Sequence, residues 1–168
     1  MAAATIHIRV KYGASTEETG DAADLNLLSS DLGSGQTTAS YPITVPSVGT
    51  NYSYERKFRL KVEDIGDSSR IQNLRVYADT ATPSTGCTIN YGQTSSYATP
   101  VNTVSSVATD AIPTSLPGTE NLYCGGSGSG YLDATGEYSD YGVLQLAVGT
   151  TATSGGNATV TIAYDEVA

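Results

Sequence analysis

His7 is the only histidine in the sequence, so any catalytic arrangement of the Ser-His-Asp or Cys-His type has to include it. In "TIHIRVKY" it alternates with apolar residues, which places it on the polar side of a strand. The sequence has no G-x-S-x-G elbow, phosphate loop or dinucleotide fingerprint. We therefore expect His7 to be a solvated strand residue and the protein not to be an enzyme. A glycosidase with two carboxylates is the one enzyme class that the residue types leave open.

Carboxylates gather in three stretches, "TEETGDAAD", "EDIGD" and "DATGEYSD", which could supply oxygen ligands to calcium. None of the three has the spacing of an EF-hand loop, and "EDIGDSSR" is typical of a turn between two strands. Cys87 and Cys124 match no zinc pattern and form either a disulfide or two separate thiols. We expect no cofactor.

Positive charge is concentrated in residues 54–64, "YERKFRLKVED". This stretch holds four of the eight basic residues: Arg56, Lys57, Arg59 and Lys61. Residues 1–75 contain eight basic and nine acidic side chains, whereas residues 76–168 contain no basic and eight acidic ones, which together give the net charge of −9. An acidic surface repels nucleic acid and anionic lipid. We therefore expect neither nucleic acid nor a membrane as a partner.

Apolar residues alternate with polar ones throughout the chain, which is the pattern of strands with one buried face. Phe58, Leu60 and Val62 share a face, and similar alternation runs through "TIHIRVKY", "IQNLRVYAD", "YGVLQLAVG" and "NATVTIAYDEV". Weaker strand candidates are "ASYPITVP", "CTINY", "DLNLLS" and "ENLYCGG". The pattern predicts an all-β protein, an antiparallel two-sheet sandwich of about eight strands, jelly-roll-like or immunoglobulin-like, that spans residues 1–168 as one domain.

Long connections are expected at residues 13–37, 92–120 and 125–137, and connections of this length often carry function. The second is rich in Val, Ile and Thr and nearly uncharged, so it could lie extended against a neighbouring chain or fold back on its own sandwich. Its candidate interface residues are Tyr97, Val101, Val104, Val107 and Ile112.

Lys57, Arg59 and Lys61 alternate along one strand and form a basic stripe, next to Arg56, on a face expected to be wet. Either the stripe is a solvated face that is flanked by Glu55 and Glu63 and neutralised by carboxylates across the sheet, or it docks on an acidic surface of another copy or of the shell beneath. The second alternative predicts a trimer or ring.

The start of the chain, "MAAATIHIRVKY", lacks the basic and apolar regions of a secretion signal, and no run of about 18 apolar residues is present. We expect the protein to be made in the host cytoplasm without a signal peptide.

Two long segments carry a resemblance to known proteins: "YERKFRLKVEDIGDSSRIQNLRVYADTATPSTGCTINYGQTSSYATPVNT" and "YSDYGVLQLAVGTTATSGGNATVTIAYDEV". Their basic strand, Thr-rich middle and closing Tyr-Asp-Glu strand resemble small structural proteins of tailed bacteriophages, of the capsid decoration or cement type. The resemblance implies a non-enzymatic protein of the virion that binds copies of itself and a major capsid or tail protein.

A second interpretation is a carbohydrate- or receptor-binding β-sandwich, such as a tail or surface adhesin. Tyrosines recur in the second half of the chain and can stack on sugar rings when they are exposed. They are Tyr91, Tyr97, Tyr123, Tyr131, Tyr138 and Tyr141.

Overall fold

The computed structural model describes residues 2–78, 84–126, 128–154 and 156–168. These residues form strands and loops, with no helix and hence none that could cross a membrane. The ten strands are β1 (Thr5–Tyr12), β2 (Thr16–Glu17), β3 (Thr50–Tyr52), β4 (Arg56–Asp64), β5 (Arg70–Ala78), β6 (Cys87–Thr94), β7 (Asp110–Ala111), β8 (Tyr131–Leu132), β9 (Tyr141–Gly149) and β10 (Val160–Val167). The expectation of an all-β protein is confirmed.

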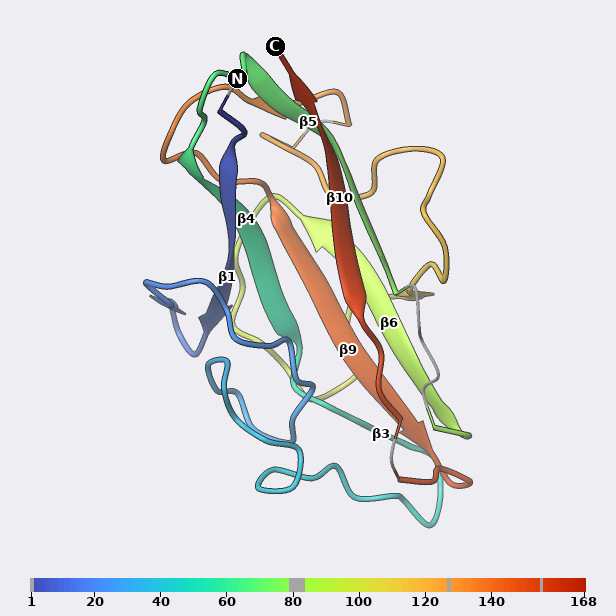
Figure 1. Ribbon diagram of the computed structural model, residues 1–168. Helices are drawn as coiled ribbons and strands as arrows, with labels where there is room; N and C mark the ends of the chain where they lie inside the picture. Colours follow the sequence, from blue (N-terminus) through green and yellow to red (C-terminus); the bar gives the residue numbers. More distant parts are fainter. Residues whose placement is uncertain (1, 79–83, 127, 155) are drawn as a thin grey trace.

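The strands of the described residues form two antiparallel sheets that face each other (Figure 1). The large sheet has the order β2-β1-β4-β9-β6-β7, with β3 paired to β9 beside this path. The small sheet has the order β10-β5-β8. β4 and β5 follow each other in the chain but belong to different sheets, so the turn between them crosses from one layer to the other. The architecture is the predicted two-sheet sandwich, with ten strands in place of about eight.

The core lies between the sheets and contains the apolar residues that alternate along the strands. Phe58 and Val62 of β4 are fully buried, and they pack with Leu74 and Val76 of β5 and with Leu144 of β9. Gly142 lies opposite Phe58 in the pairing of β9 with β4, and it leaves the space that the phenyl ring occupies. The period-two pattern therefore identifies the core-facing side of β4 and β5 correctly.

The small sheet has only three strands, and a loop from the first long connection covers part of the large sheet. Leu28 of this loop is 1% exposed, and its carbonyl accepts a hydrogen bond of 2.9 Å from the backbone N–H of Tyr54. The N–H of Ala22 donates to the carbonyl of Ile8 on β1 over 2.8 Å. Residues 13–37 are therefore a partial wall of the sandwich.

Of the four weak strand candidates, one forms part of a strand in the structure. "CTINY" lies in β6, as predicted, whereas "ASYPITVP" and "DLNLLS" are loops. "ENLYCGG" contains only a single bridge residue, Cys124. Short strands that the pattern did not reveal lie in the connections: β2 in residues 13–37, β7 in 92–120 and β8 in 125–137, of which residue 127 is outside the described part.

Candidate interaction surface on the basic face of the large sheet

The outer face of the large sheet places like charges directly opposite each other. In the antiparallel pairing of β1 with β4, Arg9 lies opposite Arg59 and Lys11 opposite Lys57, and His7 of β1 also faces a lysine of β4. Like charges at such positions destabilise a sheet unless other groups compensate them. We call this set the basic face: His7, Arg9, Lys11, Lys57, Arg59 and Lys61.

Carboxylates of the same chain compensate most of these charges. Glu63 pairs with Arg9 and, over 3.0 Å, with the Nζ of Lys61. Glu17 accepts hydrogen bonds from Arg59, with the shortest nitrogen–oxygen distance 2.6 Å. The hydrogen bond from Lys61, together with Arg9, lowers the pKa of Glu63 below its usual value. The basic face is thus neutralised within the chain.

Tyrosine rings cover the remaining part of the basic face. The guanidinium of Arg59 lies 3.6 Å from the ring centre of Tyr138, and the Nζ of Lys11 lies 4.6 Å from that of Tyr97. The rings of Tyr97 and Tyr141 lie against each other, with their centres 5.6 Å apart. Cations attract the faces of aromatic rings, so these tyrosines both shield and stabilise the charges.

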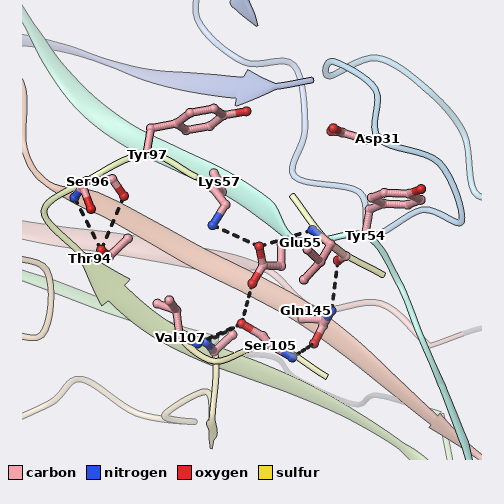
Figure 2. A network of polar contacts seen from close by, with 12 residues as sticks. Asp31, Tyr54, Glu55, Lys57, Thr94, Ser96, Tyr97, Ser105, Val107 and Gln145 are labelled. Atoms are coloured by element: carbon pink, nitrogen blue, oxygen red, sulfur yellow. Dashed lines mark hydrogen bonds and ion pairs between the residues drawn. The ribbon is translucent and has the colours of Figure 1, made fainter. Parts of the chain in front are cut away.

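Lys57 and Glu55 form an ion pair that is buried beneath residues 95–109, which we call the cover loop (Figure 2). Their side chains are 2% and 4% exposed, and Nζ lies 3.0 Å from Oε2. The hydroxyl of Ser105 donates to the other oxygen of Glu55 over 2.5 Å. The backbone N–H of Glu55 donates to the carbonyl of Val101 over 2.9 Å. A buried charge therefore ties the cover loop to the sheet.

Gln145 of β9 provides the second anchor of the cover loop (Figure 2). Its side chain is fully buried, and its amide nitrogen donates to the carbonyls of Thr103 and Ser53, over 2.8 and 3.0 Å. Its amide oxygen accepts from the backbone N–H of Ser105 over 2.9 Å. Buried polar groups are costly unless they are paired, so this set of bonds holds the loop in one conformation.

The expectation that the basic stripe is wet is wrong for Lys57, which is 2% exposed. Arg56, which lies beside the stripe and on the face of Phe58, is 5% exposed. Arg56 faces inward and donates to the carbonyls of Asn26 and Leu32, and its burial lowers the pKa of the guanidinium. Neither Arg56 nor Lys57 is therefore accessible to a second protein. Arg59 and Lys61 are half-buried.

The other candidate interface residues divide into buried and exposed ones. Ile112 is 5% exposed and belongs to the core, and Tyr97 and Val107 are half-buried. Val101 and Val104 are 39% and 67% exposed on the outside of the cover loop. In the single chain the loop folds back on its own sandwich, in line with the first of the two alternatives for this segment.

Tyr97 fixes the start of the cover loop to the edge of the sheet. Its hydroxyl donates to the carbonyl of Gly13 over 2.7 Å. Burial, with the nearby charge of Asp31 and the second ring of Tyr141, raises the pKa of Tyr97 to about 12. The phenol therefore stays protonated and keeps this hydrogen bond at neutral pH.

Sequence reasoning missed Gln145 and Glu55 as the anchors of this region. The signal was present for Gln145, since it is a single amide within the apolar run "VLQLAV", on the side of the strand that was expected to be wet. An uncharged polar residue between apolar neighbours is typical of a buried hydrogen-bonding position.

The carboxylates of the three acidic stretches mainly bind backbone N–H groups of their own loops. Glu18 accepts from Ser34, Asp24 from Gly35, and Glu137 from Asp133 and Ala134. In the part of the chain that the structure describes, no group of three or more His, Cys, Asp or Glu residues is arranged to hold a metal ion. These acidic residues therefore stabilise turns.

Cys87 and Cys124 are both free thiols, so the disulfide alternative is wrong. Burial raises the pKa of both, for Cys124 to about 12, which keeps them protonated and unreactive at neutral pH. His7 has its Nδ1 3.5 Å from Glu63, and no hydrogen bond found among the described residues joins it to a Ser or Cys. The arrangement contains no paired nucleophile and base.

A comparison with known protein families, with curated proteins and with solved structures finds no match for this chain. The functional argument therefore depends on the geometry of the surface.

Proposed function

We propose that this protein is a non-enzymatic structural component of a phage-type virion, a decoration or cement protein that binds copies of itself and a shell or tail protein. The observation that carries the proposal is the cover loop. The loop carries two exposed valines, Val101 and Val104. On its inner side, hydrogen bonds to Gln145 and Glu55, two of them through Ser105, fix its position.

A loop held in this way suits docking because it is ordered before it binds. Ordering a flexible loop at an interface costs free energy, and a preformed loop avoids most of that cost. Val104 is 67% exposed, although a valine gains about 1.5–3 kcal/mol from full burial. An apolar side chain that a rigid loop exposes is well suited to fill a pocket on a partner protein.

The internal pairing of the basic face also supports a docking role for the loop rather than for the stripe. Glu63, Glu17 and Glu55 already neutralise its charges. Residues 76–168, with eight acidic and no basic side chains, keep an excess of negative charge that the basic face does not neutralise. This excess favours a partner whose contact surface is apolar or basic.

The carbohydrate- or receptor-binding alternative has less support. Of the six tyrosines on which it depended, Tyr91 and Tyr141 are buried, and Tyr97 and Tyr138 cover cations. Among the six, Tyr131 is the exposed one, with 51% of its surface accessible to solvent. A single exposed ring is a poor platform for a sugar.

The test is co-sedimentation of the purified protein with shells and, separately, tails assembled from the proteins encoded beside its gene. We expect saturable binding to one of the two particles. Val104→Asp should weaken it about ten-fold or more, because the carboxylate would be buried without a partner. Val48→Asp is the matched control, since Val48 is an exposed valine in a different loop. Absence of binding to both particles, together with retention on a polysaccharide column, would replace this proposal with the adhesin alternative.

A further inference from the structure

A groove of about 530 Å³, lined by apolar and polar residues in similar measure, lies between the two sheets, where the small sheet does not cover the large one. Its floor includes Ile8, Ile89 and Leu146 of the large sheet. Residues 22–27 and residues 156–160, which lead into β10, also line it. Asp24 is the one charged residue among those that line the groove, and it already accepts from the N–H groups of Asn26 and Gly35.

β10 is an edge strand of the small sheet, and its first residue, Val160, is among those that line the groove. In the pairing of β10 with β5, Val160 lies opposite Ala78 and Ile162 opposite Val76. The backbone of Val76 bonds to the side chain of Asn121, and the N–H of Ala78 donates to Pro113, both on the side of β5 away from β10. Val76 and Ala78 are therefore at the non-hydrogen-bonded positions of this antiparallel pair. It follows that the N–H and C=O groups of Val160 and Ile162 point outward, away from β5.

Residues 42–46, "PITVP", form a loop segment that we call the arm, in which Ile43 and Pro46 are half-buried and the other residues are exposed. Val45 is 45% exposed, and the arm carries no charge. Among the hydrogen bonds of the described residues, the arm takes part in one, from the side-chain amide of Asn51 to the carbonyl of Thr44. Ile, Thr and Val favour extended backbone, so this loop segment is suited to pair as a strand with an open sheet edge.

We propose that the groove binds the arm of a second copy of this chain, which adds a strand to the open edge of β10. The antiparallel register places Ile43 opposite Ile162 and Val45 opposite Val160. The N–H groups of Ile43 and Val45 then face β10, whereas Pro42 and Pro46, which have no N–H, fall on the far edge and end the sheet. The proposal rests on the self-association that is part of the proposed function and is independent of binding to a shell.

The register also orients the side chains correctly. Paired residues of neighbouring strands point to the same face of a sheet. Val160 and Ile162 pack toward the core, so Ile43 and Val45 of the arm would point to the floor of the groove. Thr44 would point outward and keep its carbonyl on the edge opposite β10. Backbone bonds supply the strand pairing, and the two apolar side chains fill the groove.

The occupant is a second copy because the arm is tied outside the groove of its own chain. The carbonyl of Tyr41, immediately before the arm, accepts from Ser29 over 3.2 Å, and that of Thr44 within the arm accepts from Asn51 over 2.8 Å. Each copy has one arm and one groove, which permits a closed pair or ring in which every arm is used. The arm is uncharged, so it enters the groove without an unpaired charge.

Cross-linking between two different variants tests the register directly. One protein carries Val45→Cys and the other Val160→Cys, both with Cys87→Ser to remove the thiol in the groove. Residues directly opposite in a hydrogen-bonded antiparallel pair have Cα atoms about 5.5 Å apart, which a disulfide can span. Mild oxidation of the mixture should give a disulfide-linked heterodimer. The matched control replaces Val45→Cys with Val48→Cys, which is more exposed but outside the arm, and it should give less product.

Sedimentation velocity of the purified protein, without any shell, measures the association itself. We expect wild type to associate and Val45→Asp to weaken association about ten-fold or more, whereas Val48→Asp should change it less than about two-fold. Equal cross-linking of positions 45 and 48 to position 160 would overturn the proposal. A monomeric wild type, or one whose groove binds a small apolar dye equally in the monomer and the assembly, would also overturn it.

Discussion

The side chains of Lys57 and Glu55 lie on the same face of the chain near the start of β4, and both are almost completely shielded from solvent. Their charged atoms are 3.0 Å apart, and the hydroxyl of Ser105 bonds to the same carboxylate. Removing one member of a buried ion pair leaves the other charge without a partner, and this is more costly than removing both. The pair is therefore the part of the cover loop most sensitive to substitution.

Lys57→Met should lower the free energy of unfolding by about 3–5 kcal/mol, because Glu55 would remain charged and buried. The double variant Glu55→Gln, Lys57→Met should lose less than Lys57→Met alone. Urea unfolding monitored by tyrosine fluorescence measures both. Arg75→Ala is the control, since Arg75 pairs with Asp165, whose side chain is 46% exposed, and such a pair contributes only about 0–1 kcal/mol. A double variant as unstable as the sum of its single variants would contradict this account.

Gln145→Leu should release the cover loop while the sheet stays folded. The substitution leaves the carbonyl of Thr103 and the N–H of Ser105 without their present partner, which costs about 1–3 kcal/mol for each buried group that water cannot reach. Hydrogen exchange should become faster in residues 101–107 and change little in β5. Gln72→Leu, at a half-buried glutamine of β5, is the control. Unchanged protection of the loop in Gln145→Leu would mean that Glu55 alone holds it.

Gly142→Ala should destabilise the core, because a Cβ at this position would overlap the ring of Phe58 on the neighbouring strand. Overpacking of this kind typically costs about 1–3 kcal/mol. Phe58→Leu in the same chain should recover part of the loss, which thermal unfolding of the two single variants and the double variant will show. Gly20→Ala is the control, since no atom lies within 4 Å of the added Cβ. If the stability losses of the two single variants were additive in the double variant, overlap between the added Cβ and the ring of Phe58 would not be the cause.

Stability should fall at alkaline pH as the buried tyrosines ionise. The pKa of Tyr97 is raised from 10.0 to about 12, mainly by burial, so the folded state holds this proton between these values whereas the unfolded state releases it. The contribution of this phenol is therefore complete below pH 10.0 and is lost as the pH rises toward about 12. Tyr97→Phe should show a shallower decline in urea midpoint over this range. Identical pH dependence in the two proteins would show that other groups control the alkaline transition.

The local sequence pattern predicts part of the surface, and Val104 is an example. It lies in a nearly uncharged segment with three prolines, and such a segment has few ways to be buried as regular structure. The sequence made Val104 a candidate interface residue, but it did not identify the side chains that hold its loop. Residues 95–109 are held by Gln145, which is 40 positions away from Ser105 in the chain. No local pattern encodes a contact at that separation.

The sequence by itself determined which face of β4 packs in the core, because side chains alternate strictly between the two faces of a sheet. Phe58, Leu60 and Val62 illustrate this, since all three are 3% exposed or less. The opposite face was decided only by the tertiary structure. Lys57 and Arg59 alternate along one strand with the same local pattern, yet Lys57 is sealed under the cover loop and Arg59 is stacked on Tyr138. Whether a polar side chain meets water or a buried partner depends on what the rest of the chain places above it, and that is fixed only when distant segments pack together.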